Sequence, residues 1–393
     1  MDNKGAILIV TSWILAILTL FAVGVGFRTG LEIKLTGYNL DKVKTLYIAK
    51  AGIRRAVIEK WKEYAEGRSL NIDSYAEDWG NIEEYFKEVK FGGGSFELSF
   101  YHPDFADSKR GILLYGLEDE SGRININSDK GVKVFKNLLL NFGFDLKEAE
   151  DIAGSIKDWR DEDNVAQSVG EEASGAEDAY YQSLEEPYST RGEEFKALEE
   201  ILLVKGVTDK LFYGGDRDGD GVIGKGEHGL INLLTVYGAG KININTAPRE
   251  VLDGAFGIGY SDLASKVVDY RNGMDGDFGT SDDRWFTMGD IIVERGTKGL
   301  VEVKDLNDES WYGNIFGITN IEYTRIRDLI TKEGLLSTSS GVYRANVTAT
   351  VDKVRKVVTA VISFNAPLQV ENRGFSEEIP PPDIEYLYWH EER

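Results

Sequence analysis

The pattern of apolar and polar positions divides the chain into an N-terminal helix, a set of strands and a long helical middle. Residues 6–27 form an unbroken apolar run. At 1.5 Å per residue, a helix of about 22 residues reaches about 33 Å, which is enough to cross the hydrocarbon core of a bilayer. The sequence therefore predicts a membrane-spanning helix over residues 6–27.

Helical spacing continues beyond the predicted span. Apolar side chains recur at intervals of three, four or seven residues, as on the buried stripe of a helix: Leu46, Ile53, Val57, Trp61 and Tyr64. The opposite face carries charged side chains. We expect the helix to continue over residues 28–67, to dock on a globular body and to stop near Gly67.

Two separated regions alternate between apolar and polar residues, as half-buried strands do. The first lies within residues 96–117 and the second within residues 343–364, where Asp352-Lys353 is the expected turn. An antiparallel sheet made from both regions requires the chain between them to be an insertion. The pattern predicts an α+β host with a long N-terminal helix on an antiparallel sheet. We assign residues 68–128 and 337–366 to the host, residues 129–336 to an inserted α-helical domain, and residues 367–393 to a Pro-rich tail.

The predicted insertion contains an internal repeat. Residues Gly122–Ser128 match residues Gly240–Thr246, and each copy leads into a helical segment, an acidic loop and a short helix. The short helix is expected to begin at Phe195 in the first copy and at Trp285 in the second. Ser128 and Thr246 are the expected N-caps of the helices that follow. The insertion is thus predicted to hold two helix-hairpin-helix units of the same kind.

Composition excludes several classes of function. The net charge of -22 argues against nucleic acid and anionic membrane surfaces as partners, because like charges repel, and it suits the binding of cations. The chain has no cysteine, so disulfides, thiol catalysis and cysteine-zinc sites are excluded. Bound metal is one alternative way to stabilise such a fold.

The clearest candidate for metal binding is the acidic loop from Asp216 to Glu227. Carboxylates at alternate positions can surround one ion, a glycine permits the sharp turn, one carbonyl adds a ligand and a glutamate at the twelfth place closes the shell. The expected ligands are Asp216, Asp218, Asp220, the carbonyl of Val222, and Glu227. We therefore predict a structural Ca²⁺ ion there.

Two other acidic segments are weaker candidates. Asp275, Asp277, Asp282 and Asp283 form a second possible calcium site, although their spacing is not that of a standard loop. The equivalent region of the first repeat contains Asp161, Asp163, Glu177 and Asp178. For that region, a solvated charged loop is the preferred interpretation.

An alternative function is suggested by the second repeat. Residues 244–271 resemble the helix-hairpin-helix units of competence DNA receptors, which hold phosphate through backbone amides and basic side chains. Here the hairpin region carries Asp253, Asp262 and Asp269 in an acidic protein. A packing role is therefore favoured over DNA binding.

The leader also points to a particular processing route. A short, weakly basic leader that ends in glycine directly before the apolar run resembles a type IV prepilin signal, whose peptidase would cut between Gly5 and Ala6. The alternative is an ordinary uncleaved anchor. The fifth residue after the cut is Val10, where most pilin-like subunits carry glutamate. Since a buried carboxylate needs a partner from the subunit above, Val10 suggests a position at the filament tip.

These features together resemble general secretion pathway protein K, the large minor pseudopilin of type II secretion systems. The resemblance covers nearly the whole chain and rests on motifs in a shared order: the Gly5-Ala6 junction, Val10, Ala49 to Gly52, Gly122 to Asn127, Asp158-Trp159, Gly175 to Asp178, Tyr180-Tyr181, Leu198 to Glu200, Lys241 to Pro248, Tyr270-Arg271 and Gly279 to Arg284. It implies a pilin-like core with an inserted α-helical domain and bound calcium.

The resemblance also implies a function without catalysis. The protein would be a single-pass inner-membrane protein with its globular part in the periplasm, and it would cap the pseudopilus and help to start its assembly. Expected partners are other minor pseudopilins in a tip heterotrimer, the major pseudopilin, the prepilin peptidase and the inner-membrane secretion platform. The alternatives are a DNA-uptake receptor, a type IV pilus adhesin and an anchored enzyme that uses paired carboxylates.

Overall fold

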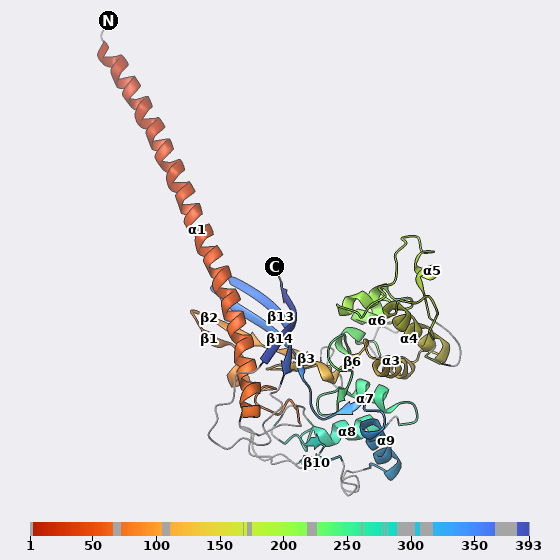
Figure 1. Cartoon of the computed structure of the whole chain (residues 1–393). Coiled ribbons are helices and arrows are strands. Elements are labelled where there is room, and N and C mark those ends of the chain that lie inside the picture. The colour runs from red at the N-terminus through yellow and green to blue at the C-terminus, as the bar shows by residue number, and fades with distance from the viewer. Residues whose placement is uncertain are drawn as a thin grey trace.

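The computed structural model describes residues 3–65, 72–103, 111–167, 169–170, 175–217, 226–260, 262–276, 278, 280, 282–288, 303–306, 317–365 and 383–392. Its most prominent element is the helix α1 (Asn3–Ala65), which projects from a globular body (Figure 1). Among the described residues, the segment Gly5–Glu63 of this helix is the one stretch long and apolar enough to cross a membrane. The predicted stop at Gly67 lies outside the described residues.

The last turns of α1 pack on a sheet. Ile48, Ala49, Ile53, Ala56 and Val57 are buried against it, spaced as one face of a helix requires. Leu46 and Trp61 are partly buried at the edges of the same contact. The side chains of residues 5–40 are exposed by contrast, so α1 has a free half and a docked half.

The host sheet combines strands from both ends of the chain, in the order β1-β2-β12-β13-β14, with β5 paired to β12. The strands are β1 (Val89–Phe91), β2 (Gly94–Leu98), β5 (Glu118–Asp119), β12 (Val342–Val351), β13 (Val354–Asn365) and β14 (Asp383–Glu391). All pairs are antiparallel. Asp352 adopts a positive φ of 50° in the tight turn between β12 and β13, where aspartate is one of the tolerated residues. The predicted α+β class with an insertion is confirmed.

The C-terminal strand was not anticipated as part of this sheet. The segment Asp383–Glu391 pairs with β13 of its own chain, and the register shifts between Val361 and Ile362. A β-bulge of this kind increases the local twist of an edge strand. The tail is thus the last strand of the host sheet, whereas residues 366–382 lie outside the described residues.

A second core lies in the inserted domain, which Figure 1 shows beside and below the sheet. Its helices are α3 (Asp129–Asn141), α4 (Leu146–Arg160), α5 (Asp178–Tyr181), α6 (Asp209–Tyr213), α7 (Arg249–Phe256), α8 (Leu263–Arg271) and α9 (Asn320–Thr331). Short strands link distant segments: β6 (Ile124–Asn125), β7 (Leu234–Thr235), β8 (Ile242–Asn243), β9 (Trp285–Thr287), β10 (Val303–Asp305) and β11 (Leu336–Ser337). Outside both groups, the short elements are α2 (Glu83–Phe86), β3 (Phe100–His102) and β4 (Ile112–Leu114).

The two repeat copies have the same local structure. The strand β6 pairs in parallel with β7, as β8 does with β11. The side-chain amide of Asn127 bonds the backbone of Phe195, and that of Asn245 bonds the backbone of Phe286 in the same two-way pattern. The helix pairs α3–α4 and α7–α8 follow the two strands, and α3 approaches α7 at Gly254, whose carbonyl accepts a hydrogen bond from Asn137 at 3.0 Å. The duplication is therefore visible in the fold.

Several details of the repeat differ from the sequence prediction. Phe195 is equivalent to Phe286 rather than to Trp285. The short helix of the first copy is a 3-10 helix that begins at Leu198, and the second copy has strand β9 at Trp285 instead of a helix. Ser128 is the N-cap residue of α3, but α7 begins after Pro248. The Thr246 hydroxyl instead donates to Asp119 at 2.7 Å. Thr246 thus joins the insertion to the host, a role that local sequence does not reveal.

Candidate metal centre

Three carboxylates of the first repeat converge at the end of α4. One oxygen from each of Asp161, Asp163 and Glu177 lies within 4.8 Å of the other two. Asp161 is the C-cap residue of α4 and Glu177 is the N-cap residue of α5, so the ends of two helices hold the cluster. Oxygens bound to one Ca²⁺ at 2.3–2.6 Å are at most about 5.2 Å apart, so this spacing fits a single ion.

A fourth carboxylate lies behind the cluster. Asp158 is fully buried on α4, and one of its oxygens accepts a hydrogen bond from the backbone of Gln167 at 2.7 Å. Its other oxygen is buried without a hydrogen-bond partner, as are one oxygen of Asp161 and both oxygens of Glu177. Buried acceptors of this kind are costly unless a cation or a donor satisfies them.

The electrostatics agree with this geometry. Burial, followed by repulsion from the Asp158, Asp161 and Asp163 charges, raises the pKa of Glu177 to about 7. Burial is also the main cause that raises the pKa of Asp158 to about 6, and the pKa of Asp161 is raised for the same reason. Each shift reflects a carboxylate that is unstable as an anion in its present surroundings. A divalent cation would remove this instability.

The sequence prediction for this region differs from the structure. It favoured a solvated charged loop at Asp161, Asp163, Glu177 and Asp178, whereas three of these four side chains converge and Asp161 and Glu177 are partly buried. The Asp178 carboxylate turns to other partners, the amide and hydroxyl of Thr190, at 2.7 and 2.9 Å. The sequence signal for three of these carboxylates is their position at the end of a helix: Asp158 lies on the last turn of α4, Asp161 is its C-cap residue and Asp163 follows two residues later.

The strongest loop in the sequence is described only at its ends. Glu227 is buried, and its carboxylate accepts a hydrogen bond from the backbone of Arg217 at 2.6 Å. The backbone of Gly215 also donates to the Glu227 carbonyl at 2.9 Å, so the two ends of the loop, next to Asp216 and at Glu227, are joined. Asp218, Asp220 and Val222 lie outside the described residues. Calcium binding in this loop stays a prediction.

The second predicted site is organised by hydrogen bonds within its own loop. Asp282 accepts from the backbone of Met274 at 2.6 Å and from the Thr280 hydroxyl at 2.8 Å. These hydrogen bonds lower the pKa of Asp282 to about 2, and the bond from the backbone of Met274 has the largest effect. Asp283 is buried, Asp275 accepts from Thr280, and Asp277 lies outside the described residues. The loop is thus held in shape by its own donors, and a metal there stays a prediction as well.

The hairpin between α7 and α8 has the shape expected of a helix-hairpin-helix unit, with positive φ at Gly257 and Gly259. Basic side chains near it are engaged within the protein. Lys266 pairs with Glu322 at 2.7 Å, and Arg325 pairs with Glu333 and donates to the Phe256 carbonyl. Phosphate binding would require these cations to be available. The contacts therefore support a packing role for the hairpin.

Comparisons with known proteins agree on one family. Residues 114–213, which include the converging carboxylates, match the family model described as type II secretion system (T2SS), protein K. The chain is 26% identical over 215 residues to type II secretion system protein K of Aeromonas hydrophila, and 25% identical over 212 residues to that of Pectobacterium carotovorum subsp. carotovorum. Each match covers 53% of this chain and 60% of the relative, so the chain spans less than two thirds of the length of these relatives.

The fold is also known from a solved structure. A chain in the crystal structure of the GspK-GspI-GspJ complex from the enterotoxigenic Escherichia coli type 2 secretion system aligns with a TM-score of 0.55 and 13% identity. The alignment covers 91% of this chain and 99% of that chain. At this identity the match shows the fold alone. Together with the family model and the two relatives, it confirms the resemblance of this chain to type II secretion system protein K.

Proposed function

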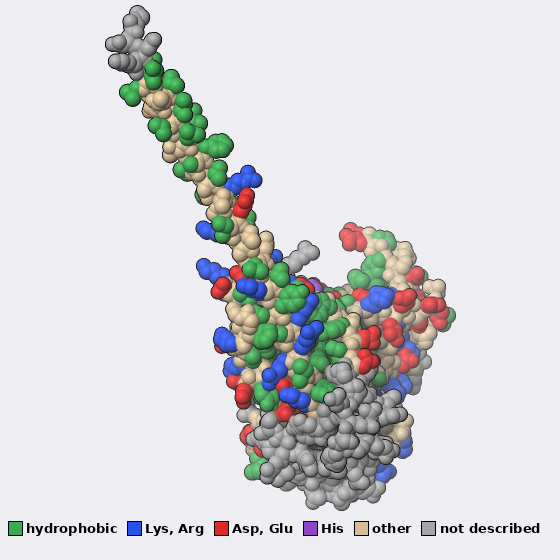
Figure 2. Space-filling view, turned by 60° about the vertical axis from the view of Figure 1, so that its left-hand side comes forward, with side chains coloured by type: hydrophobic (Ala, Val, Ile, Leu, Met, Phe, Trp, Pro, Cys, Tyr) green, Lys and Arg blue, Asp and Glu red, His purple; other side chains and the backbone are tan. Residues whose placement is uncertain are grey.

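We propose that this chain is a non-enzymatic minor pseudopilin, which caps the tip of a type II secretion pseudopilus and helps to start its assembly. The observation that carries the proposal is the form of α1: its C-terminal part is docked on a sheet (Figure 1), and its N-terminal part projects with exposed hydrophobic side chains (Figure 2). A free apolar helix of this length needs a lipid or protein environment. The similarity to protein K of two secretion systems supports the same assignment.

The proposed mechanism is mechanical. The N-terminal half of α1 lies in the inner membrane, with the globular part in the periplasm, until neighbouring subunits withdraw it into the filament. The inserted domain then occupies the space in which a further subunit would stack. Val10 is consistent with a position at the filament tip, because an apolar residue needs no ammonium group of a subunit above as a partner.

The proposed partners are other pseudopilins. The aligned solved structure is named as a GspK-GspI-GspJ complex, so we propose that this chain binds the equivalent GspI-type and GspJ-type subunits of its own system. The major pseudopilin, the prepilin peptidase and the inner-membrane platform complete the proposed set. Purification of the full chain in detergent should recover both small subunits, and recovery of neither would contradict the assignment.

Replacing Gly5 by alanine should leave the leader attached. The peptidase is proposed to cut between Gly5 and Ala6, and the added methyl group changes the residue at the cleaved bond. Co-expression with the peptidase, followed by N-terminal sequencing, measures the outcome. Gly24→Ala is a matched control, since both glycines lie in α1 with open space at the Cβ position. Normal processing of Gly5→Ala would refute the leader assignment.

We further propose that Ca²⁺ stabilises the inserted domain through Asp161, Asp163 and Glu177 at one site and through the Asp216–Glu227 loop at another. In the first site the ion would neutralise carboxylates that repel one another, with Asp158 behind them. Calcium prefers such hard oxygen ligands. The ion would therefore have a structural role.

The calcium affinity of the first site should fall on acidification. With a pKa of about 7 for Glu177 and about 6 for Asp158, protons compete with the ion below pH 7. Affinity should weaken roughly tenfold between pH 8 and pH 6, because one carboxylate must lose a proton before the ion binds. Calorimetric titration of an Asp216→Asn, Glu227→Gln variant measures this affinity without the contribution of the Asp216–Glu227 loop. An affinity independent of pH would show that the cluster does not bind the ion.

A further inference from the structure

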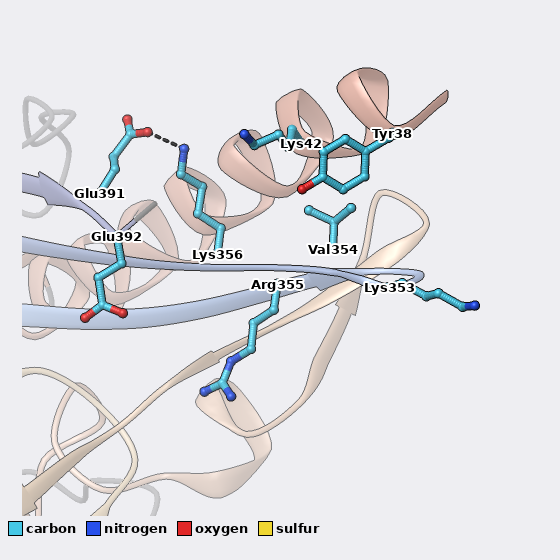
Figure 3. A pocket seen from close by; sticks show the side chains of 8 residues that line it. All are labelled: Tyr38, Lys42, Lys353, Val354, Arg355, Lys356, Glu391 and Glu392. Carbon is cyan, nitrogen blue, oxygen red and sulfur yellow. Dashed lines mark hydrogen bonds and ion pairs between the residues drawn. The ribbon is translucent and has the colours of Figure 1, made fainter. Parts of the chain in front are cut away.

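A basic groove lies between α1 and the hairpin of β12 and β13, with a cavity volume of about 700 Å³ (Figure 3). Tyr38 and Lys42 line it from α1, the hairpin contributes Lys353, Val354, Arg355 and Lys356, and the chain at the end of β14 contributes Glu391 and Glu392, so basic side chains outnumber acidic ones. Glu391, at the end of β14, reaches in from the edge of the sheet and pairs with Lys356. The groove thus combines several cations with a small apolar floor.

The groove is basic, whereas most of this protein is acidic. The inserted domain, residues 129–336, has 41 acidic and 23 basic residues, in a chain of net charge -22. Residues 28–62 of α1 have nine basic and three acidic residues instead. Lys42 and Lys353 are exposed at the groove. A cationic surface on an acidic protein attracts partners that the rest of the surface repels.

The groove already accommodates one carboxylate and one apolar contact. The Glu391 side chain is bound by Lys356, which shows that an acidic group fits there. The ring of Tyr38 lies above Val354 in Figure 3, with the Lys42 ammonium 5.8 Å from the ring centroid. An incoming acidic segment would therefore find exposed cations beside a place for an apolar side chain.

An exposed apolar stripe leads along α1 into the groove. Leu31, Leu35 and Tyr38 follow one another at helical spacing and are each about half exposed. A neighbouring helix that packs on this stripe would bring its following residues to Lys42 and Lys353. We propose that the groove docks an acidic segment of a neighbouring pseudopilin, with carboxylates on these two lysines. This inference rests on the proposed function.

A lipid headgroup is the less favoured occupant because of distance. Lys42 lies fifteen residues beyond Phe27, the last residue of the predicted span, which is about 22 Å along the helix. The headgroup layer adds only about 5–8 Å to each side of the hydrocarbon core, and charges are screened beyond about 8 Å. The groove is therefore placed beyond the membrane surface, where protein neighbours are found.

The test measures binding of the GspI-type and GspJ-type subunits to the full chain in phosphatidylcholine nanodiscs. Lys42→Glu with Lys353→Glu should weaken binding at least tenfold at low salt, and the difference should shrink in high salt. Lys133→Glu with Lys147→Glu is the matched control, because it makes the same change of charge at two exposed lysines of the inserted domain. The control should bind as the unaltered chain does.

Each other outcome has a distinct meaning. If the unaltered chain binds neither subunit, the proposed function fails. If it binds them and the groove variant binds equally well, the proposed function stands and the docking groove is refuted. The lipid alternative is tested with nanodiscs that contain phosphatidylglycerol, in the absence of both subunits. If these nanodiscs protect Lys42 and Lys353 of the unaltered chain from acetylation, and the groove variant still binds the subunits normally, lipid is the occupant and the proposal is overturned. A Lys42→Gln, Lys353→Gln variant with an unchanged melting temperature excludes misfolding as the cause of lost binding.

Discussion

Chelation of calcium should lower the melting temperature of the protein by about 5–10 °C. An ion present at about one hundred times its dissociation constant adds about 2.7 kcal/mol to the stability of the folded state. For a domain of about 200 residues, each kcal/mol corresponds to about 2–4 °C. Near the Asp161, Asp163 and Glu177 cluster, the gain arises because the ion neutralises carboxylates that have buried oxygens without partners.

Two pairs of substitutions assign this effect to its site. Asp161→Asn with Glu177→Gln removes the cluster at the end of α4, and Asp216→Asn with Glu227→Gln removes the ends of the predicted loop. Each pair should erase its own share of the calcium-dependent shift, and the four substitutions together should erase nearly all of it. Thermal unfolding in detergent micelles, with calcium and with chelator, measures both effects. The same melting temperature in both conditions would exclude a structural metal.

Replacing Lys60 by methionine should destabilise the protein by about 3–5 kcal/mol at pH 8, the usual cost of removing one partner from a buried ion pair. Lys60 is fully buried on α1, where it forms an ion pair with Asp73 and lies 3.4 Å from Glu63 and 3.8 Å from Glu77. Without the ammonium, three acidic groups would remain together in the core. Urea unfolding, followed by tryptophan fluorescence, gives the change in free energy.

The loss of stability caused by Lys60→Met should be larger at high pH than at low pH. Burial raises the pKa of Asp73 to about 7, because desolvation outweighs the attraction of Lys60, and burial with the Glu77 charge raises that of Glu63. A carboxyl group whose folded pKa exceeds its unfolded value contributes stability at low pH, and this contribution is lost as the pH rises through the folded pKa. The native protein should therefore gain stability from pH 8 to pH 6, and the penalty of Lys60→Met should be smaller at pH 6.

A surface lysine provides the control for this substitution. Lys62 pairs with Glu59 at 2.9 Å but is 43% exposed, so Lys62→Met should cost less than about 1 kcal/mol. Adding Asp73→Asn to Lys60→Met should restore part of the lost stability, because it removes one of the uncompensated charges. Equal effects of Lys60→Met and Lys62→Met at pH 8 would show that the buried cluster does not hold α1 to the body.

The host fold could be predicted because its signals are local and periodic. The apolar run at residues 6–27 and the alternation in β12 and β13 are readable without any knowledge of distant contacts. The insertion followed from the order of these signals along the chain. The C-terminal strand β14 could not be assigned to the sheet, because it is mostly exposed and its pairing with β13 follows a long connection.

The candidate site depended more on contacts between distant residues. Asp161 and Glu177 meet because α4 ends close to the place where α5 begins, which spacing alone does not indicate. The repeat was visible in sequence, but its register at Phe286 became clear only from the hydrogen bonds of Asn245. Thr246 was expected to cap a helix, yet it bonds Asp119 of the host, a partner more than one hundred residues away.

The position of the protein in an assembled pseudopilus tests the central proposal most directly. Gold-labelled antibodies against the inserted domain, applied to isolated filaments, report where the subunit lies and how many copies each filament holds. We expect label at one end of each filament, in a single copy, because the inserted domain is proposed to leave no space for a further subunit above it. Label distributed along the length of the filaments would show that the protein is not restricted to the tip.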